Sequence, residues 1–328
     1  MRFGLRLPTY IFPEGTASLD TLIAYAQKAE SHGFDSLWVM DHYLIAAPSY
    51  RVAYLDPLLV LASVASASNT LRLGTSILQV PLRQPVMLAQ QLATLDWLSD
   101  GRFDLGIGVG WQKEEFEGAG VSLRERGKRL DEYLEAMVCL WTNETASYHG
   151  QFVNFDEITL EPRPVQKPYP PLSFGGGSTV EIIYADDPTY QTPQPNVDRV
   201  YRRIGRWASA WQATSTSDPR LLERDWEHIV RYAEEFGRSP GDIERMQTTF
   251  LIITEDSAEA RECYNRIVGF DFDQFIAQSS YLYGPAEKLV EELKEREEMG
   301  ISRMILTPVR GELSELDEWA ERILSAFK

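Results

Sequence analysis

The chain has 328 residues, of which 44% are hydrophobic, and its formal net charge is −17. That length suffices for one large barrel-type domain or for two domains of ordinary size. A nucleic-acid-binding protein needs a concentrated basic face, and here the short basic cluster Arg199–Arg206 falls in an amphipathic segment. Nucleic acid and anionic membrane are therefore not expected as partners.

Strand-like and helix-like segments alternate along the first 142 residues. Short apolar segments indicate buried strands, and apolar residues at helical spacing indicate helices. In the first helix, Ser18 is a suitable N-cap and Gly33 is a natural end. The predicted strands span residues 2–7, 36–40, 71–77 and 102–110, and the predicted helices span 19–32, 56–68, 85–99 and 129–141.

The second half continues this alternation around two insertions. Aromatic residues and a glycine indicate a hairpin over 148–160, inserted after the fourth strand-helix unit. The region 179–197, which has three prolines and no periodicity, predicts a surface or lid excursion after the fifth strand. Further strands are predicted at 170–178, 207–214, 248–254 and 301–309, with helices at 221–237, 257–268 and 284–300 and a closing helix.

About eight strands interleaved with helices favour a (β/α)8 TIM barrel, an α/β fold, with insertions after strand four and after strand five. A doubly wound sheet is the second possibility, because periodicity does not distinguish a closed sheet from an open one. We expect residues 1–328 to form a single domain. In such a barrel, functional groups gather at the carboxyl ends of the strands.

The N-terminal stretch and the hydropathy pattern indicate the cellular location of the protein. The stretch "MRFGLRLPTY" has no basic region followed by an apolar run, so no signal peptide is expected. No apolar run approaches the roughly 18 residues that a transmembrane helix needs. We therefore expect a cytoplasmic protein with no membrane partner.

An aspartate and a histidine, Asp41 and His42, follow the second predicted strand. Both are costly at the end of a buried segment unless something there needs them. Asp41 could cap the next segment beside a half-buried His42, or the imidazole could face the barrel mouth with the carboxylate orienting it or binding a ligand. Histidine suits the second role, because its unperturbed pKa of about 6.5 allows proton transfer near neutral pH.

The next strand ends carry small and aromatic residues. Gly74 and Ser76 could admit a ligand ring closely or simply pack small side chains at the rim. The glycines around Gly108 run G-x-G-x-G and precede an acidic segment, so the dinucleotide fingerprint G-x-G-x-x-G is excluded. Trp111 could stack on a planar ligand or cover the core. The glycine turn 175–178 could bind an anion through its backbone N–H groups or form a plain flexible turn.

Other reaction classes lack their motifs. No H-E-x-x-H, no H-x-H in the first strand and no G-x-S-x-G occurs, so a zinc hydrolase or a serine hydrolase is not expected, and no metal is predicted. A glycosidase needs two carboxylates across a cleft, and Asp41 and Glu114 could be proposed. Nothing in the sequence sets their separation.

Four stretches resemble the luciferase-like monooxygenase superfamily, whose members are barrel enzymes that use FMN or the deazaflavin F420. These stretches, 29–42, 71–121, 126–142 and 152–178, cover most of residues 1–178. The last third is similar more weakly, mainly over 283–293. In the family, a short link joins the glycine turn to the next helix. In this chain that link is longer, and the additional residues are about 179–197.

The resemblance implies a site at the strand ends. Asp41 would lie near the deazaflavin, and His42 would lie near the reacting carbon as a catalytic acid or base. A non-proline cis peptide that backs the ring would fall at Ser76–Ile77, and the glycine turn would hold the phosphate. The implied cofactor-binding residues are Asp41, Ser76, Ile77, Gly175, Gly176, Gly177 and Ser178.

Either cofactor needs a dry, apolar pocket beside its ring. Where the F420-dependent sugar-phosphate dehydrogenases have a glutamate after the strand-four glycines, this chain has a tryptophan, which argues against that substrate class. The candidate pocket residues are Tyr10, Trp38, Trp111 and Tyr281.

The leading hypothesis is an F420-dependent oxidoreductase that transfers hydride to or from a small organic substrate, with His42 donating or accepting the proton. The alternative is an FMN-dependent monooxygenase that uses O2 and reduced flavin. A flavin-binding protein without turnover is a hypothesis of another class, and the full set of strands with the Asp-His pair argues against it. The resemblance also implies a separate flavin or F420 reductase as a partner, and a homodimer.

Overall fold

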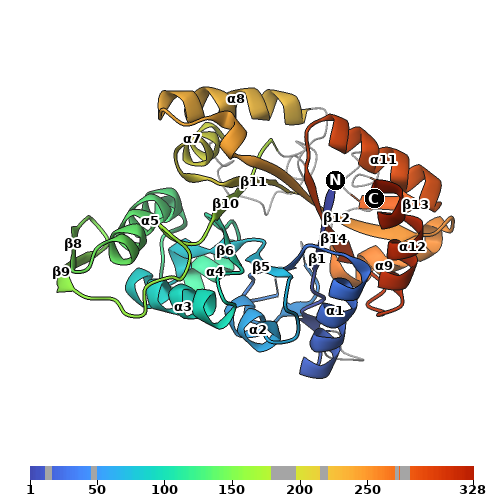
Figure 1. Ribbon diagram of the computed structural model, residues 1–328, viewed down its shortest axis with the longest axis horizontal. Helices are drawn as coiled ribbons and strands as arrows, with labels where there is room; N and C mark the ends of the chain where they lie inside the picture. Colours follow the sequence, from blue (N-terminus) through green and yellow to red (C-terminus); the bar gives the residue numbers. More distant parts are fainter. Residues whose placement is uncertain (12–16, 46–49, 179–196, 215–220, 270–272, 274–280) are drawn as a thin grey trace.

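The computed structural model describes residues 1–11, 17–45, 50–178, 197–214, 221–269, 273 and 281–328. Within them, eight parallel strands pair in a closed ring, since β7 pairs with β10 and β14 pairs with β1. The predicted (β/α)8 barrel is therefore confirmed (Figure 1). In ring order the strands are β1 (Arg2–Arg6), β3 (Ser36–Val39), β5 (Arg72–Thr75), β7 (Phe103–Gly108), β10 (Leu172–Gly175), β11 (Ala210–Ala213), β12 (Glu244–Ile253) and β14 (Arg303–Pro308).

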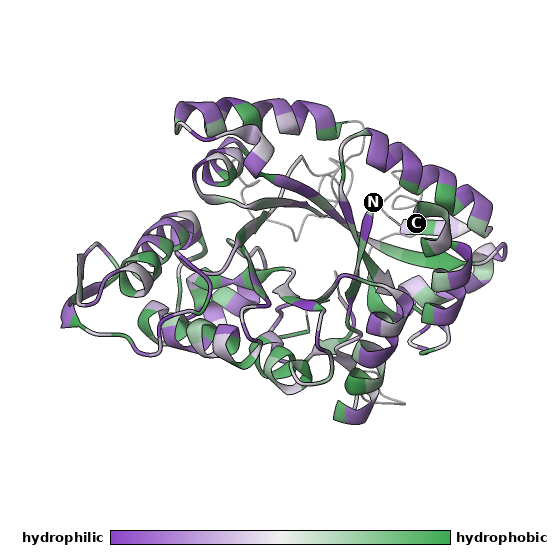
Figure 2. Ribbon diagram, in the orientation of Figure 1, coloured by the Kyte–Doolittle hydropathy of each residue, from purple (hydrophilic) through white to green (hydrophobic). Residues whose placement is uncertain are grey.

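Helices surround the ring, and the surfaces of α8 (Leu222–Glu235) and α11 (Ala286–Glu298) are largely polar (Figure 2). No helix in the described parts of the chain is both long and apolar enough to cross a bilayer. The helices are α1 (Leu19–His32), α2 (Pro57–Val64), α3 (Pro85–Leu98), α4 (Lys113–Gly118), α5 (Arg126–Thr142), α7 (Val197–Trp207), α8 (Leu222–Glu235), α9 (Ser257–Ile267), α11 (Ala286–Glu298) and α12 (Glu315–Arg322).

Local sequence signals account for where the first helix begins and ends. The Ser18 hydroxyl accepts a hydrogen bond from the Thr21 amide, as an N-cap does. Gly33 ends α1 in the left-handed conformation, with φ of 86°, and its N–H donates to the carbonyls of Ala29 and Glu30. Both predicted caps are confirmed.

Several short strands lie outside the ring. Between α5 and β10, β8 (Ala146–His149) and β9 (Asn154–Ile158) form an antiparallel hairpin. The pair β2 (Tyr10–Ile11) and β4 (Ala53–Tyr54) is also antiparallel, whereas β6 (Leu78–Gln79) and β13 (Tyr281–Gly284) extend the barrel sheet in parallel on β7 and β12. Residues 179–196 of the predicted excursion lie outside the described residues.

Strand β12 begins earlier than the predicted 248–254. Its first residues are mainly polar, so they lack the apolar pattern that indicates a strand. They pair with both β11 and β14 nevertheless. The Glu244 carboxylate accepts a hydrogen bond from Arg2 at 2.7 Å, which satisfies a charge at the amino end of the barrel.

Trp38 fills the middle of the barrel. A Cβ added at Gly74 would lie 2.3 Å from the Trp38 ring, and one at Gly4 would lie 2.6 Å from Trp38 Nε1. Glycines on the two flanking strands thus make room for the indole. The buried cluster around Trp38 is completed by Ala210, Met246 and Ile305.

Candidate active site

His42 lies just beyond the carboxyl end of β3, and its side chain is buried. Its Nδ1 is 3.3 Å from Oε1 of Glu115, which is on α4. The same carboxylate accepts hydrogen bonds from the Tyr43 amide at 2.6 Å and from Gln79 Nε2 at 2.8 Å. A carboxylate at Nδ1 fixes the orientation of an imidazole and leaves Nε2 to meet a ligand.

The Glu115 side chain is a buried anion. Burial opposes its ionisation, but hydrogen bonds from His42, Gln79 and the Tyr43 amide outweigh that effect and lower the pKa of the carboxyl. Glu115 was not predicted from the sequence, because it lies among similar acidic residues after β7. The available signal was helical spacing: Gln112, Glu115 and Phe116 are buried on one face, while the neighbouring carboxylates are exposed.

Asp41 supports the segment that carries His42. Its Oδ2 accepts a hydrogen bond from the Gln79 amide at 2.8 Å, and its Oδ1 accepts one from Arg83 Nη2 at 2.9 Å. Burial raises the pKa of the Asp41 carboxyl, and Arg83 opposes this. Both carboxylate oxygens are used within the protein, so any contact of Asp41 with a cofactor stays a prediction.

Three aromatic side chains surround the His42 ring. The ring centroids of Tyr50, Tyr54 and Trp111 lie 5.1, 5.7 and 5.8 Å from that of the imidazole. Trp111 was a predicted pocket residue, and the structure places it here. The two tyrosines were not predicted, because the segment that carries them has no strand-end signal. Together the three rings form an aromatic wall around His42.

The other predicted pocket residues lie in packed regions instead. Trp38 is in the barrel core, where its Nε1 donates to Ser36 Oγ at 2.8 Å. Tyr10 and Tyr281 belong to a separate buried cluster, and the Tyr10 hydroxyl donates to the Pro308 carbonyl at 2.7 Å. Large aromatic side chains contribute most when fully buried, as these three are. Tyr50 and Tyr54 of the aromatic wall pack against the cluster that holds Tyr10 and Tyr281, so a pocket role for these two residues stays a prediction.

The peptide bond between Ser76 and Ile77 is cis, as the resemblance implied. Ile77 is partly exposed and lies across the ends of two neighbouring strands. A Cβ added at Gly108 would lie 2.0 Å from Ile77 Cδ1, and one at Gly175 would lie 2.7 Å from it. An apolar side chain over bare backbone provides a surface suited to a flat ring.

The glycine turn ends at Ser178, whose polar groups have hydrogen-bond partners within the protein. The Ser178 amide donates to Asp225 Oδ2 at 2.7 Å, and the Ser178 hydroxyl donates to Asp225 Oδ1 at 2.6 Å. Tyr201 donates to the same oxygen at 2.6 Å, and Arg224 donates to the Ser178 hydroxyl. A buried carboxylate therefore already accepts the amide and the hydroxyl of Ser178, and phosphate binding by the rest of the glycine turn stays a prediction. Asp225 comes from α8, which the local sequence of the turn does not reveal.

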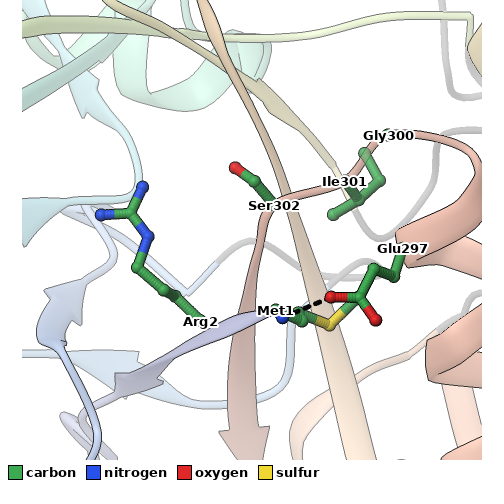
Figure 3. Close-up of a pocket in the computed structure, with 6 residues that line it drawn as sticks. All are labelled: Met1, Arg2, Glu297, Gly300, Ile301 and Ser302. Carbon is green, nitrogen blue, oxygen red and sulfur yellow. Dashed lines mark hydrogen bonds and ion pairs between the residues drawn. The ribbon is translucent and has the colours of Figure 1, made fainter. Parts of the chain in front are cut away.

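A shallow pocket, separate from the site around His42, lies at the amino end of the barrel strands (Figure 3). It is lined by the start of β1 and by residues just before β14, and the N-terminal amino group pairs there with Glu297. Functional groups of this fold gather at the carboxyl ends of the strands. The site around His42 is therefore the candidate active site.

Comparisons with known proteins agree with this geometry. The family model described as luciferase-like monooxygenase matches residues 1–307. An uncharacterised protein of Mycobacterium tuberculosis is 37% identical over 222 residues, which is 63% of this chain and 73% of that protein. The F420-dependent glucose-6-phosphate dehydrogenase of Kineococcus radiotolerans is 32% identical over 248 residues, 74% of this chain and 66% of that one.

Two further similarities are to an FMNH2-dependent enzyme and to a solved structure. The FMNH2-dependent dimethylsulfone monooxygenase of Pseudomonas putida is 31% identical over 161 residues, 47% of this chain and 42% of that one. The crystal structure of a monooxygenase from Streptomyces bottropensis has the same fold, with a TM-score of 0.79 over the whole of both chains at 23% identity. The predicted resemblance is confirmed: the chain belongs to the luciferase-like monooxygenase family and is an oxidoreductase of that family.

Proposed function

We propose that this oxidoreductase binds coenzyme F420 at the barrel mouth and transfers hydride to or from a small organic substrate. The observation that supports it most is His42, which Glu115 holds at 3.3 Å inside the aromatic wall. When bound, the deazaflavin would supply the two-electron hydride chemistry. The chain's own residues would supply binding, orientation and proton transfer.

Each of these residues has a distinct part. Nε2 of His42 would donate a proton to the substrate oxygen, or accept one from it, as the carbon beside it gains or loses hydride. Glu115 would hold the imidazole in the tautomer that exposes Nε2. The aromatic wall would exclude water from the reacting atoms.

The ring of the cofactor fits the residues present better than its phosphate does. Ile77, lying over Gly108 and Gly175, offers a flat apolar surface at the strand ends. Ser178 offers no comparable fit, because its amide and hydroxyl already donate to Asp225. We therefore assign the ring to Ile77 and do not assign the phosphate to Ser178.

The extent of similarity to known relatives favours F420 over FMN. Similarity to the F420-dependent relative extends over 74% of the chain, whereas similarity to the FMNH2-dependent relative extends over 47%. The alternative, an FMN-dependent monooxygenase, would use the same ring surface and His42, and would need a separate reductase to supply reduced flavin. In either case Trp111 argues against a sugar phosphate as the substrate.

Titration of the purified protein with F420 and with FMN, followed by cofactor fluorescence, tests the proposal. F420 should bind tightly and FMN weakly. His42→Ala should bind F420 unchanged but lose about 10²- to 10⁴-fold in turnover, the contribution typical of a general acid or base. His149→Ala, on the exposed hairpin, is the matched control. Tight FMN binding without F420 binding would favour the alternative cofactor, and normal turnover in His42→Ala would remove His42 from the mechanism.

A further inference from the structure

Arg6, the last residue of β1, points into the barrel toward the site. Gly4 faces the barrel interior, because a Cβ there would meet the Trp38 ring. Side chains alternate along a strand, so Arg6 faces the same interior two residues nearer the carboxyl end. Its guanidinium is buried, with the residue 5% exposed. A buried cation thus lies in the layer just above Trp38.

No carboxylate of the described residues forms an ion pair with this cation. Nη2 of Arg6 donates to Ser76 Oγ at 2.9 Å, and its Nε has no hydrogen-bond partner. Arg303, which is equally buried on β14, instead lies 2.9 Å from Asp35. Burial lowers the pKa of Arg6. An unpaired buried charge is costly, so its retention needs an explanation.

Two neighbouring polar groups also lack partners among the described residues. The Tyr54 hydroxyl is buried without a hydrogen bond, and Tyr54 is close enough to Arg6 to oppose the lowering of its pKa. The Thr307 hydroxyl is likewise buried and unpartnered. Since Leu5 pairs with Leu306 in the β1–β14 register, Arg6 and Thr307 lie side by side on adjacent strands.

Thr307 faces the same interior, because it is two residues beyond Ile305, which packs against Trp38. The Tyr54 ring lies 5.7 Å from the His42 ring, which connects this group to the candidate active site. Arg6 and Thr307 thus lie side by side facing the barrel interior, and Tyr54, which is close to both Arg6 and His42, is a third side chain with unused hydrogen-bonding capacity.

We propose that Arg6, with Tyr54 and Thr307, binds a negatively charged oxygen of the ligand that occupies the site. A guanidinium recognises such an oxygen through charge-assisted hydrogen bonds, and two hydroxyl groups add neutral donors. The oxygen would belong either to a carboxylate of the substrate or to the ionised ring of the bound cofactor. In both cases the assignment rests on the proposed function for the identity of the ligand.

The experiment compares wild type, Arg6→Met and Arg6→Lys in two binding assays. The first measures binding of sodium benzoate and of benzamide, a neutral analogue, to the protein without cofactor. The second measures binding of oxidised and reduced F420. Loss of a charge-assisted hydrogen bond should lower the affinity for the affected ligand by about 10- to 100-fold in Arg6→Met. Arg6→Lys should restore part of that affinity.

The pattern of losses identifies the source of the oxygen. A lower affinity of Arg6→Met for benzoate alone, with binding of benzamide and F420 unchanged, supports a substrate carboxylate. A lower affinity for F420 that is more pronounced for the reduced than for the oxidised form supports the cofactor ring. If F420 fails to bind the wild type while benzoate binds through Arg6, the anion site stands and the proposed function falls. If F420 binds and neither ligand depends on Arg6, the anion site falls and the proposed function stands.

Stability gives a readout independent of any ligand. Arg6→Met removes an unpaired buried charge, so its midpoint of thermal unfolding should equal or exceed that of the wild type. Arg303→Met, the matched control, breaks a buried ion pair and should unfold at a lower temperature. A loss of stability in Arg6→Met as large as in Arg303→Met would make Arg6 a structural residue and overturn the proposal.

Discussion

Replacing Glu115 by glutamine tests the anchoring of His42 most sharply. The side chain keeps its shape but loses its charge and one of its two acceptor oxygens. At least one of the groups that now donate to it, the Tyr43 amide at 2.6 Å or Gln79 Nε2 at 2.8 Å, would face an NH2 group instead. The Gln79 amide cannot simply turn over, because its Nε2 also donates to the Asp41 carbonyl at 2.9 Å.

The cost can be worked from these contacts. A hydrogen bond to a charged group contributes about 1.5–3 kcal/mol, and leaving a buried donor unsatisfied costs a similar amount. We therefore expect Glu115→Gln to lower the free energy of unfolding by about 2–3 kcal/mol at pH 7. The folded pKa of Glu115 is lowered, so the wild type keeps this stabilisation above the unfolded pKa and loses it as pH falls through the folded value.

Urea denaturation at pH 7 and at pH 3 measures both effects. The difference between wild type and Glu115→Gln should be large at pH 7 and should shrink at pH 3. Glu114→Gln, one residue away and exposed, is the matched control and should stay within about 0.5 kcal/mol of the wild type at both values. An unchanged stability of Glu115→Gln at pH 7 would refute the network described around His42.

Three further predictions concern stability. Burial raises the pKa of the Glu315 carboxyl to about 7. Between about pH 4.3 and 7, the folded protein therefore keeps a proton on this carboxyl that the unfolded chain has already released. The wild type should therefore lose about 3 kcal/mol across that window, and Glu315→Gln should not, as urea denaturation at pH 5 and pH 8 would reveal. Gly74→Ala should cost about 1–3 kcal/mol, because the new methyl group would lie 2.3 Å from the Trp38 ring, and an unchanged unfolding curve would contradict the packing of that ring. Asp225→Asn should lower the free energy of unfolding by about 1–3 kcal/mol, because one of the donors from Ser178 and Tyr201 would lose its acceptor, and a thermal melt with no shift would show those contacts to be dispensable.

Much of the barrel could be predicted from sequence because its strands are short apolar runs between helices. The strand before His42 is the clearest case, since all four of its residues are buried. The beginning of β12 could not be predicted, because its polar residues meet partners from other strands. The short β13 was missed for a related reason: within the described residues its one strand partner is the second half of β12, far from it in sequence.

The site was predictable only where the strand ends themselves carry it. His42 follows its strand directly, so the barrel rule located it, whereas the cis peptide at Ser76–Ile77 was predicted from the family resemblance. Glu115 and Asp225 come from helices, and their contacts depend on how those helices pack on the strand ends. Trp38 was placed at the mouth because its strand ends there, although the glycines on both flanking strands indicated that its indole is directed into the core.

A crystal structure of the protein with F420 bound would show whether the site around His42 holds the cofactor. We expect the deazaflavin ring to lie against Ile77, with its reacting carbon facing His42 and with Glu115 still bound to Nδ1. A ring bound elsewhere on the barrel, or His42 turned away from it, would rule this site out.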